Sequence, residues 1–115
     1  MPIRADGASA ARGLAGEDFA AVFKSPLRAR SAHFSLHWRP GVGSDSRFGM
    51  VVSKRLARTS VRRNLIKRQA RALFAAWSGE SAPARDVVLR LTRNPQALAR
   101  APQYAELQSL FAALT

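Results

Sequence analysis

The chain has 115 residues, with 19 Lys and Arg against 7 Asp and Glu and a formal net charge of +12. This length suits one compact domain, and the excess of cations favours a polyanionic partner, above all nucleic acid. Hydrophobic residues make up 47 %, too many for a disordered basic tail, and the absence of cysteine excludes disulfides and thiolate metal sites.

Residues 1–13 are rich in small side chains and contain no hydrophobic segment, which predicts a flexible N-terminal segment and no secretory signal. A single domain is expected at residues 14–115. No apolar stretch approaches the roughly 20 residues of a membrane span. We therefore expect a cytoplasmic protein.

A short first helix is predicted just after Gly16. Phe19, Val22 and Phe23 recur at helical spacing, and an acidic pair precedes them, where a helix N-terminus favours negative charge. Pro26 ends this pattern.

Two strands are predicted next, at residues 33–38 and 47–54. The first alternates between apolar and polar side chains. Its apolar face carries Phe34, Leu36 and Trp38, and its polar face carries His33, Ser35 and His37. The connection between the strands is short and rich in turn-forming residues, which predicts an antiparallel hairpin. The two histidines lack a third ligand of suitable spacing, so no metal site is expected.

A long helix is predicted at residues 60–77, with Thr59 or Ser60 as its N-cap. Its apolar stripe consists of Ile66, Ala70, Leu73 and Trp77, with Phe74 on the flank. A third strand at residues 86–93 and a final helix at residues 103–113 follow. This order of elements predicts an α/β fold, a two-layer α-β sandwich.

The interval between Asp45 and Glu80 contains no carboxylate but nine cations. They are Arg47, Lys54, Arg55, Arg58, Arg62, Arg63, Lys67, Arg68 and Arg71. Because no acid in this interval can neutralise them, they predict a surface for nucleic acid. A solvated basic face without a partner is the alternative. A membrane-surface helix is disfavoured, since the apolar stripe is needed to cover the sheet.

The stretch FGMVVSKR at residues 48–55, followed by RNLIKR at residues 63–68 and by Arg71, resembles the protein subunit of bacterial ribonuclease P. Residues 17–23 resemble the first helix of that family and residues 86–89 its last strand, so the resemblance covers residues 14–114. The family motif has a second arginine where this chain has Leu65.

The resemblance implies the ribonuclease P protein fold, which is ribosomal-protein-like, with the order α-β-β(-β)-α-β-α and a left-handed crossover between parallel strands. It also implies that a large RNA, with Mg²⁺ in the holoenzyme, removes the 5′ leader from precursor tRNA. The protein would bind that RNA and the single-stranded leader, and would raise the affinity for substrate and metal ions. The sequence itself offers no paired acid and base and no activated nucleophile, so no catalytic residue is expected. A ribosomal or general RNA-binding protein is the alternative.

Two sets of site residues follow from the resemblance. The residues expected to bind the catalytic RNA are Lys54, Arg55, Arg58, Arg62, Arg63, Asn64, Lys67, Arg68 and Arg71. The residues expected to bind the 5′ leader are Phe19, Phe23, Phe34, His37 and Trp38. An unstacked base can lie on an aromatic ring, although packing in a hydrophobic core is the alternative role of the phenylalanines and the tryptophan.

Overall fold

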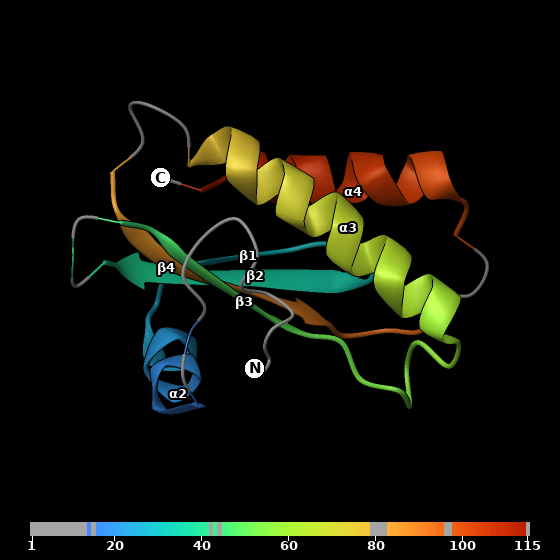
Figure 1. Cartoon of the computed structure of the whole chain (residues 1–115), viewed down its shortest axis with the longest axis horizontal. Coiled ribbons are helices and arrows are strands. Elements are labelled where there is room, and N and C mark those ends of the chain that lie inside the picture. Colours follow the sequence, from blue (N-terminus) through green and yellow to red (C-terminus); the bar gives the residue numbers. More distant parts are fainter. Residues whose placement is uncertain are drawn as a thin grey trace.

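The computed structural model describes residues 14, 16–41, 43, 45–78, 83–95 and 98–114. Its elements are α2 (Gly16–Lys24), β1 (Arg28–Arg30), β2 (Phe34–Pro40), β3 (Arg47–Val51), α3 (Ser60–Trp77), β4 (Arg85–Leu91) and α4 (Arg100–Ala112). Helices α3 and α4 cover one face of a four-stranded sheet, and α2 lies against the other (Figure 1). The expected two-layer sandwich is present, with α2 added on its second face. The predicted N-terminal segment at residues 1–13 falls outside the described residues.

The sheet has the strand order β1-β2-β4-β3. Strand β4 pairs antiparallel with β2 and parallel with β3, so it separates the two strands that were predicted to form a hairpin. That prediction is wrong. The reason lies in β4, whose Val87, Val88 and Leu89 are all fully buried. A strand that is apolar on both faces is stable at the centre of a sheet, between two neighbours.

The C-terminal ends of β1, β3 and β4 lie at the same end of the sheet, because β1 and β4 both run antiparallel to β2 while β3 runs parallel to β4. Strand β1 was not predicted from periodicity, since three residues carry too little alternation. The element order implied by the resemblance, α-β-β(-β)-α-β-α, allows a third strand before the long helix.

The predicted bounds of the long helix are confirmed, and Thr59 is its N-cap. The Oγ1 atom of Thr59 accepts a hydrogen bond from the N–H group of Arg62 at 3.1 Å. Helix α4 begins at Arg100, earlier than predicted, because Pro102 lies in its first turn, where a proline removes no helical hydrogen bond. Within the described segments, no helix combines the length and the apolar composition needed to cross a bilayer.

The main core lies between the sheet and helices α3 and α4. It contains the predicted apolar stripe of α3, and the Phe48 and Phe74 rings stack there with their centroids 4.7 Å apart. A smaller cluster lies between α2 and the opposite face of the sheet. It consists of Leu14, Val22 and Val88, with Phe19, Phe23 and Val51 packed against them. The sheet therefore has one hydrophobic cluster on each face, under α3 and α4 on one side and under α2 on the other.

Candidate nucleic-acid interfaces

The first candidate interface is the polar side of α3 together with the loop before it, and we refer to it as the α3 surface. Its exposed members are Lys54, Arg55, Arg58, Asn64 and Arg68, and its half-buried members are Lys67 and Arg71. The first turn of α3 contains no acidic residue. Since the apolar stripe of the same helix faces the core, this side lies at the surface of the molecule, and its binding to nucleic acid stays a prediction.

Arg63 and Ser53 hold the loop before α3 in a fixed shape. The Nη1 atom of Arg63 donates to the carbonyl oxygens of Ala57, at 2.8 Å, and Arg58, at 3.2 Å. The Oγ atom of Ser53 accepts from the N–H group of Leu56 at 3.3 Å, and its carbonyl oxygen accepts from Ala57 at 2.9 Å. Arg63 therefore fixes the backbone that carries Arg58, a positioning role that the motif alone did not reveal.

Arg62 differs from the prediction, because its side chain points toward α4 and not with the exposed residues of α3. Its Nη1 atom donates to Oε1 of Gln103 at 2.8 Å, and Nε2 of Gln103 donates to Oε1 of Gln69 at 2.8 Å. Gln69 in turn donates to the carbonyl oxygen of Arg100 at 3.1 Å. Gln103 is fully buried. Arg62 therefore links α3 to α4. Its Nη1 atom is bonded to Gln103, whereas the sequence predicted that the Arg62 side chain binds RNA.

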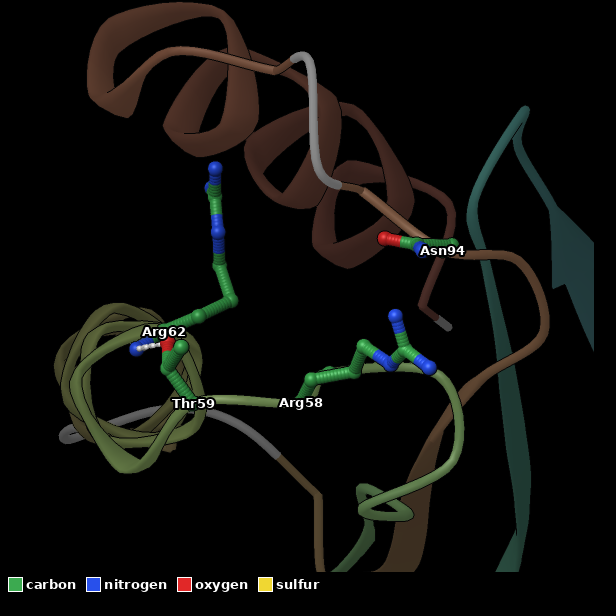
Figure 2. Close-up of a pocket in the computed structure, with 5 residues that line it drawn as sticks. Arg58, Thr59, Arg62 and Asn94 are labelled. Atoms are coloured by element: carbon green, nitrogen blue, oxygen red, sulfur yellow. Dashed lines mark hydrogen bonds between the residues drawn. The ribbon is translucent and has the colours of Figure 1, made fainter.

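A hollow of about 280 Å³ lies beside the start of α3, and we call it the α3 hollow. It is lined by Ala57, Arg58, Thr59, Arg62 and Asn94. Figure 2 shows Arg58 and Asn94 extending into the same space from two different segments, while Arg62 rises from α3 toward α4. The hollow extends the α3 surface toward the segment that follows β4.

The second candidate interface is the sheet face that carries α2, and an ion network fixes α2 at one end of it. Arg47 binds both carboxylate oxygens of Asp86, at 2.9 and 2.8 Å, and Arg39 binds Asp86 at 2.9 Å. Both arginines also contact Asp18 of α2, at 3.3 and 3.2 Å. Burial acts to raise the pKa of Asp86, but the two arginines outweigh it and lower that pKa. Arg47, counted among the unneutralised cations, is thus neutralised by acids from distant segments.

His37 lies at the centre of this face, beneath α2. Its Nε2 atom is 2.8 Å from Oγ of Ser35, and the Phe23 ring meets its imidazole edge-on, with centroids 4.8 Å apart. Burial lowers the pKa of His37, and the charges of Arg28, Arg90 and Arg30 lower it further. The imidazole is therefore neutral at pH 7.

The tip of the Phe19 ring packs against Gly49 of β3. A Cβ atom built on Gly49 would overlap the Phe19 ring, so glycine is required for this close approach. Phe19 and Phe23 are both half-buried, which means that each contributes to the α2 cluster and keeps part of its ring accessible.

Phe34 and Trp38 do not reach this face, and the prediction that they bind the 5′ leader is wrong. Phe34 is 0 % exposed and Trp38 is 4 % exposed, and both belong to the main core under α3 and α4. The alternation of β2, correctly predicted, places them opposite His37. Their rings are therefore unavailable to an unpaired base.

Three arginines on the α2 face were missed in the sequence. Arg28, Arg30 and Arg90 are exposed, and the strand register aligns Arg30 with Ser35 and Ser35 with Arg90. We call Arg30, Ser35 and Arg90 the sheet row. The Arg90 guanidinium lies 5.7 Å from the Phe23 ring centroid. The alternation of side chains along β1 and β4 could have placed these cations on the same face of the sheet as His37.

Among the residues that the structure describes, no three His, Asp or Glu side chains gather in a way that could hold a metal ion. The polar groups of both interfaces are cationic or neutral donors, apart from the acids of the ion network. This chemistry suits binding of phosphates and bases.

Comparisons with known proteins agree with this reading. The family model described as Ribonuclease P matches residues 11–115. A ribonuclease P protein component of Azoarcus sp. (strain BH72) is 36 % identical over 98 residues, which are 85 % of this chain and 81 % of that relative. One from Burkholderia mallei (strain SAVP1) is 42 % identical over 82 residues, which are 71 % of this chain and 59 % of that relative.

Solved structures show the same fold. The Staphylococcus aureus RNase P protein superposes with a TM-score of 0.75 at 22 % identity, covering 87 % of this chain and 92 % of that one. The Thermotoga maritima RNase P protein superposes with a TM-score of 0.70 at 22 % identity, covering 85 % and 94 %. The sheet order and the arrangement of the helices are therefore those of known proteins.

Proposed function

Because the chain belongs to the ribonuclease P protein family, we propose that its two interfaces divide the work of that ribonucleoprotein, the α3 surface binding RNase P RNA and the α2 face binding the 5′ leader of precursor tRNA. Proteins of this family are the protein component of a tRNA-processing enzyme in which the RNA carries the catalytic role. This chain accordingly contributes binding and positioning.

The observation that carries the proposal is the separation of two cationic surfaces by one sheet. The α3 surface presents exposed Lys54, Arg55, Arg58 and Arg68 on a fixed loop and a rigid helix. Arginine can bind two phosphate oxygens at once, and each neutralised phosphate releases counterions. A rigid cationic surface of this kind favours a structured RNA over a flexible one, because its charges are held in one arrangement.

The α2 face suits a single strand. The Phe23 ring meets the neutral imidazole of His37 edge-on and lies under the Arg90 guanidinium, and Phe19 is half-buried in the same cluster. The charges of Arg28, Arg30 and Arg90 all act on that imidazole. A base can stack on an exposed ring edge or face with little regard to its identity, while the arginines neutralise the backbone. Recognition that tolerates sequence is what a protein acting on many precursor tRNAs requires.

The same proposal assigns Mg²⁺ to the holoenzyme, where this chain would raise metal affinity by fixing the RNA, and places the protein in the cytoplasm. The chain's own contribution would be charge: by neutralising phosphates near the reacting RNA, it reduces the repulsion that metal ions otherwise have to screen.

The direct experiment mixes the full chain with bacterial RNase P RNA at low Mg²⁺ and follows the cleavage of precursor tRNA. Cleavage faster than with RNA alone is expected. Removing two exposed charges of the α3 surface (Lys54→Gln with Arg68→Gln) should weaken this stimulation. Arg85→Gln, which removes one charge at the start of β4 and outside both interfaces, is the control. RNA binding without any stimulation of cleavage would contradict the proposal and favour a general RNA-binding protein.

A further inference from the structure

A second hollow lies on the other side of the segment that follows β4, and neither interface yet accounts for it. It has a volume of about 350 Å³ and is lined by Arg30, Ser31, Ala32, Thr92 and Arg93. We call it the β1 hollow. Arg93 lines it, whereas the next residue, Asn94, lines the α3 hollow. The segment that follows β4 therefore contributes residues to both hollows.

The walls of the β1 hollow are fixed by hydrogen bonds. The N–H groups of Thr92 and Arg93 donate to the carbonyl oxygen of His33, at 2.8 and 3.3 Å. The N–H group of His33 donates to Glu106 of α4 at 2.7 Å, and its Nδ1 atom lies 2.9 Å from the same carboxylate. The hydroxyl of Ser31 also donates to Glu106. Helix α4 thus holds the turn between β1 and β2 against the end of β4, and these hydrogen bonds fix the backbone on two sides of the hollow.

The charge of the β1 hollow comes from two exposed arginines. No carboxylate in the described part of the chain forms an ion pair with Arg30 or Arg93. Glu106 accepts hydrogen bonds from Ser31 and from the backbone N–H group of His33, and its other oxygen lies 2.9 Å from Nδ1 of His33. Arg30, Arg93 and Thr92 all line the hollow, and their side chains supply N–H and O–H donors of the kind that bind a phosphate group.

The β1 hollow is continuous with the α2 face through Arg30. Arg30 lines the hollow and is also the edge member of the sheet row, whose Arg90 contacts Phe23. A strand of RNA that lies against α2 can therefore follow the row to the hollow. We propose that the β1 hollow binds a backbone phosphate of the 5′ leader, beyond the nucleotides that contact α2. The inference rests on the proposed binding of the leader and adds a phosphate site and the direction in which the leader leaves the sheet.

The test uses the reconstituted holoenzyme and two precursor tRNAs, one with a single-nucleotide leader and one with a leader of about ten nucleotides, within the roughly 4–16 nucleotides that a small single-strand-binding domain covers. The dissociation constant of each substrate is measured at several salt concentrations. The double variant Arg30→Gln/Arg93→Gln should weaken binding of the long-leader substrate on the order of 5- to 20-fold. Its salt slope should fall by roughly 0.7 for each phosphate that the variant no longer neutralises. The single-nucleotide substrate should bind as it does to the unmodified holoenzyme.

Arg85→Gln is a single-charge control, because Arg85 lies on β4 at the end of the sheet away from the hollow, and it should leave both constants unchanged. Equal losses for the two substrates would overturn the inference, since the hollow would then contact RNase P RNA or the tRNA body. An unchanged long-leader constant would overturn it as well. If the unmodified holoenzyme itself fails to distinguish the two leaders, the proposed leader binding fails, a result that differs from failure of the hollow alone.

Discussion

At the scale of single residues, Leu65 marks where this chain leaves the family motif. It is half-buried, and it is not among the described residues that pack against the main core. Arg62, the nearest cation on the N-terminal side apart from Arg63, is tied to Gln103 and does not replace the missing charge on the exposed side. The α3 surface therefore has one cation fewer than the motif provides.

Leu65→Arg should restore that charge. We expect affinity for RNase P RNA to rise about 5-fold, the equivalent of ~1 kcal/mol, and the salt slope of binding to steepen by roughly 0.7 to 0.9. Filter binding at several salt concentrations measures both quantities. Gln108→Arg adds the same charge to an exposed position of α4 and should change neither. A variant Leu65→Arg that binds no better would mean that RNA does not approach this side of α3.

A pH prediction follows from His37. Its pKa is lowered in the folded protein, so the folded state resists protonation that the unfolded chain accepts. The associated stability is complete above the unfolded pKa of about 6.5 and is lost as pH falls toward the lower folded value. The free energy of unfolding, measured with urea, should therefore be lower at about pH 5 than at about pH 7.

His37→Gln should remove most of that decrease, because glutamine does not titrate. Asp86 and Glu106 also have lowered pKa values, but their stability is lost only as pH falls below ordinary carboxyl values of 3.8 and 4.5. The pH range in which His37 affects stability is therefore separate from the range in which these two carboxyl groups do. An equal decrease in the variant and the unmodified protein between about pH 7 and about pH 5 would assign the effect to another group.

At the scale of elements, α3 could be predicted to the residue, whereas the pairing of the strands could not. Eighteen residues with a complete apolar stripe and a threonine cap define a helix locally. The position of β4 between β2 and β3 depends on which strand is buried on both faces, and that is a property of the whole sheet. The ion network shows the same limit, since Asp18 and Asp86 meet Arg47 only after folding.

The contact between α3 and α4 gives a prediction at this scale. Gln103→Ala removes the partner of both Arg62 and Gln69, which leaves polar groups at the helix interface without their hydrogen bonds. The free energy of unfolding in urea should fall by about 1–3 kcal/mol. Gln108→Ala, at an exposed position of the same helix, should change it by less than about 0.5 kcal/mol. A Gln103→Ala protein as stable as the control would show that this polar chain contributes no net stability.

At the scale of the whole molecule, the sheet divides a chain of net charge +12 into two cationic surfaces. The cations of the α3 surface could be located from the sequence, because they are contiguous and no acid lies among them. The sequence predicted the α2 face only in part. Phe19, Phe23 and His37 lie there, but the cations of that face come from β1 and β4 and converge only in the folded sheet. Phe34 and Trp38 were assigned to it because aromatic character alone does not reveal which face of a strand is covered.

The most direct test of two separate surfaces is a titration of RNase P RNA with protein at low Mg²⁺, reading cleavage of precursor tRNAs with long and with single-nucleotide leaders. Lys54→Gln/Arg68→Gln should raise the protein concentration needed for half-maximal stimulation and should leave the preference for the long leader, measured at saturating protein, unchanged. Loss of that preference in this variant would contradict the account, because one surface would then bind both RNAs.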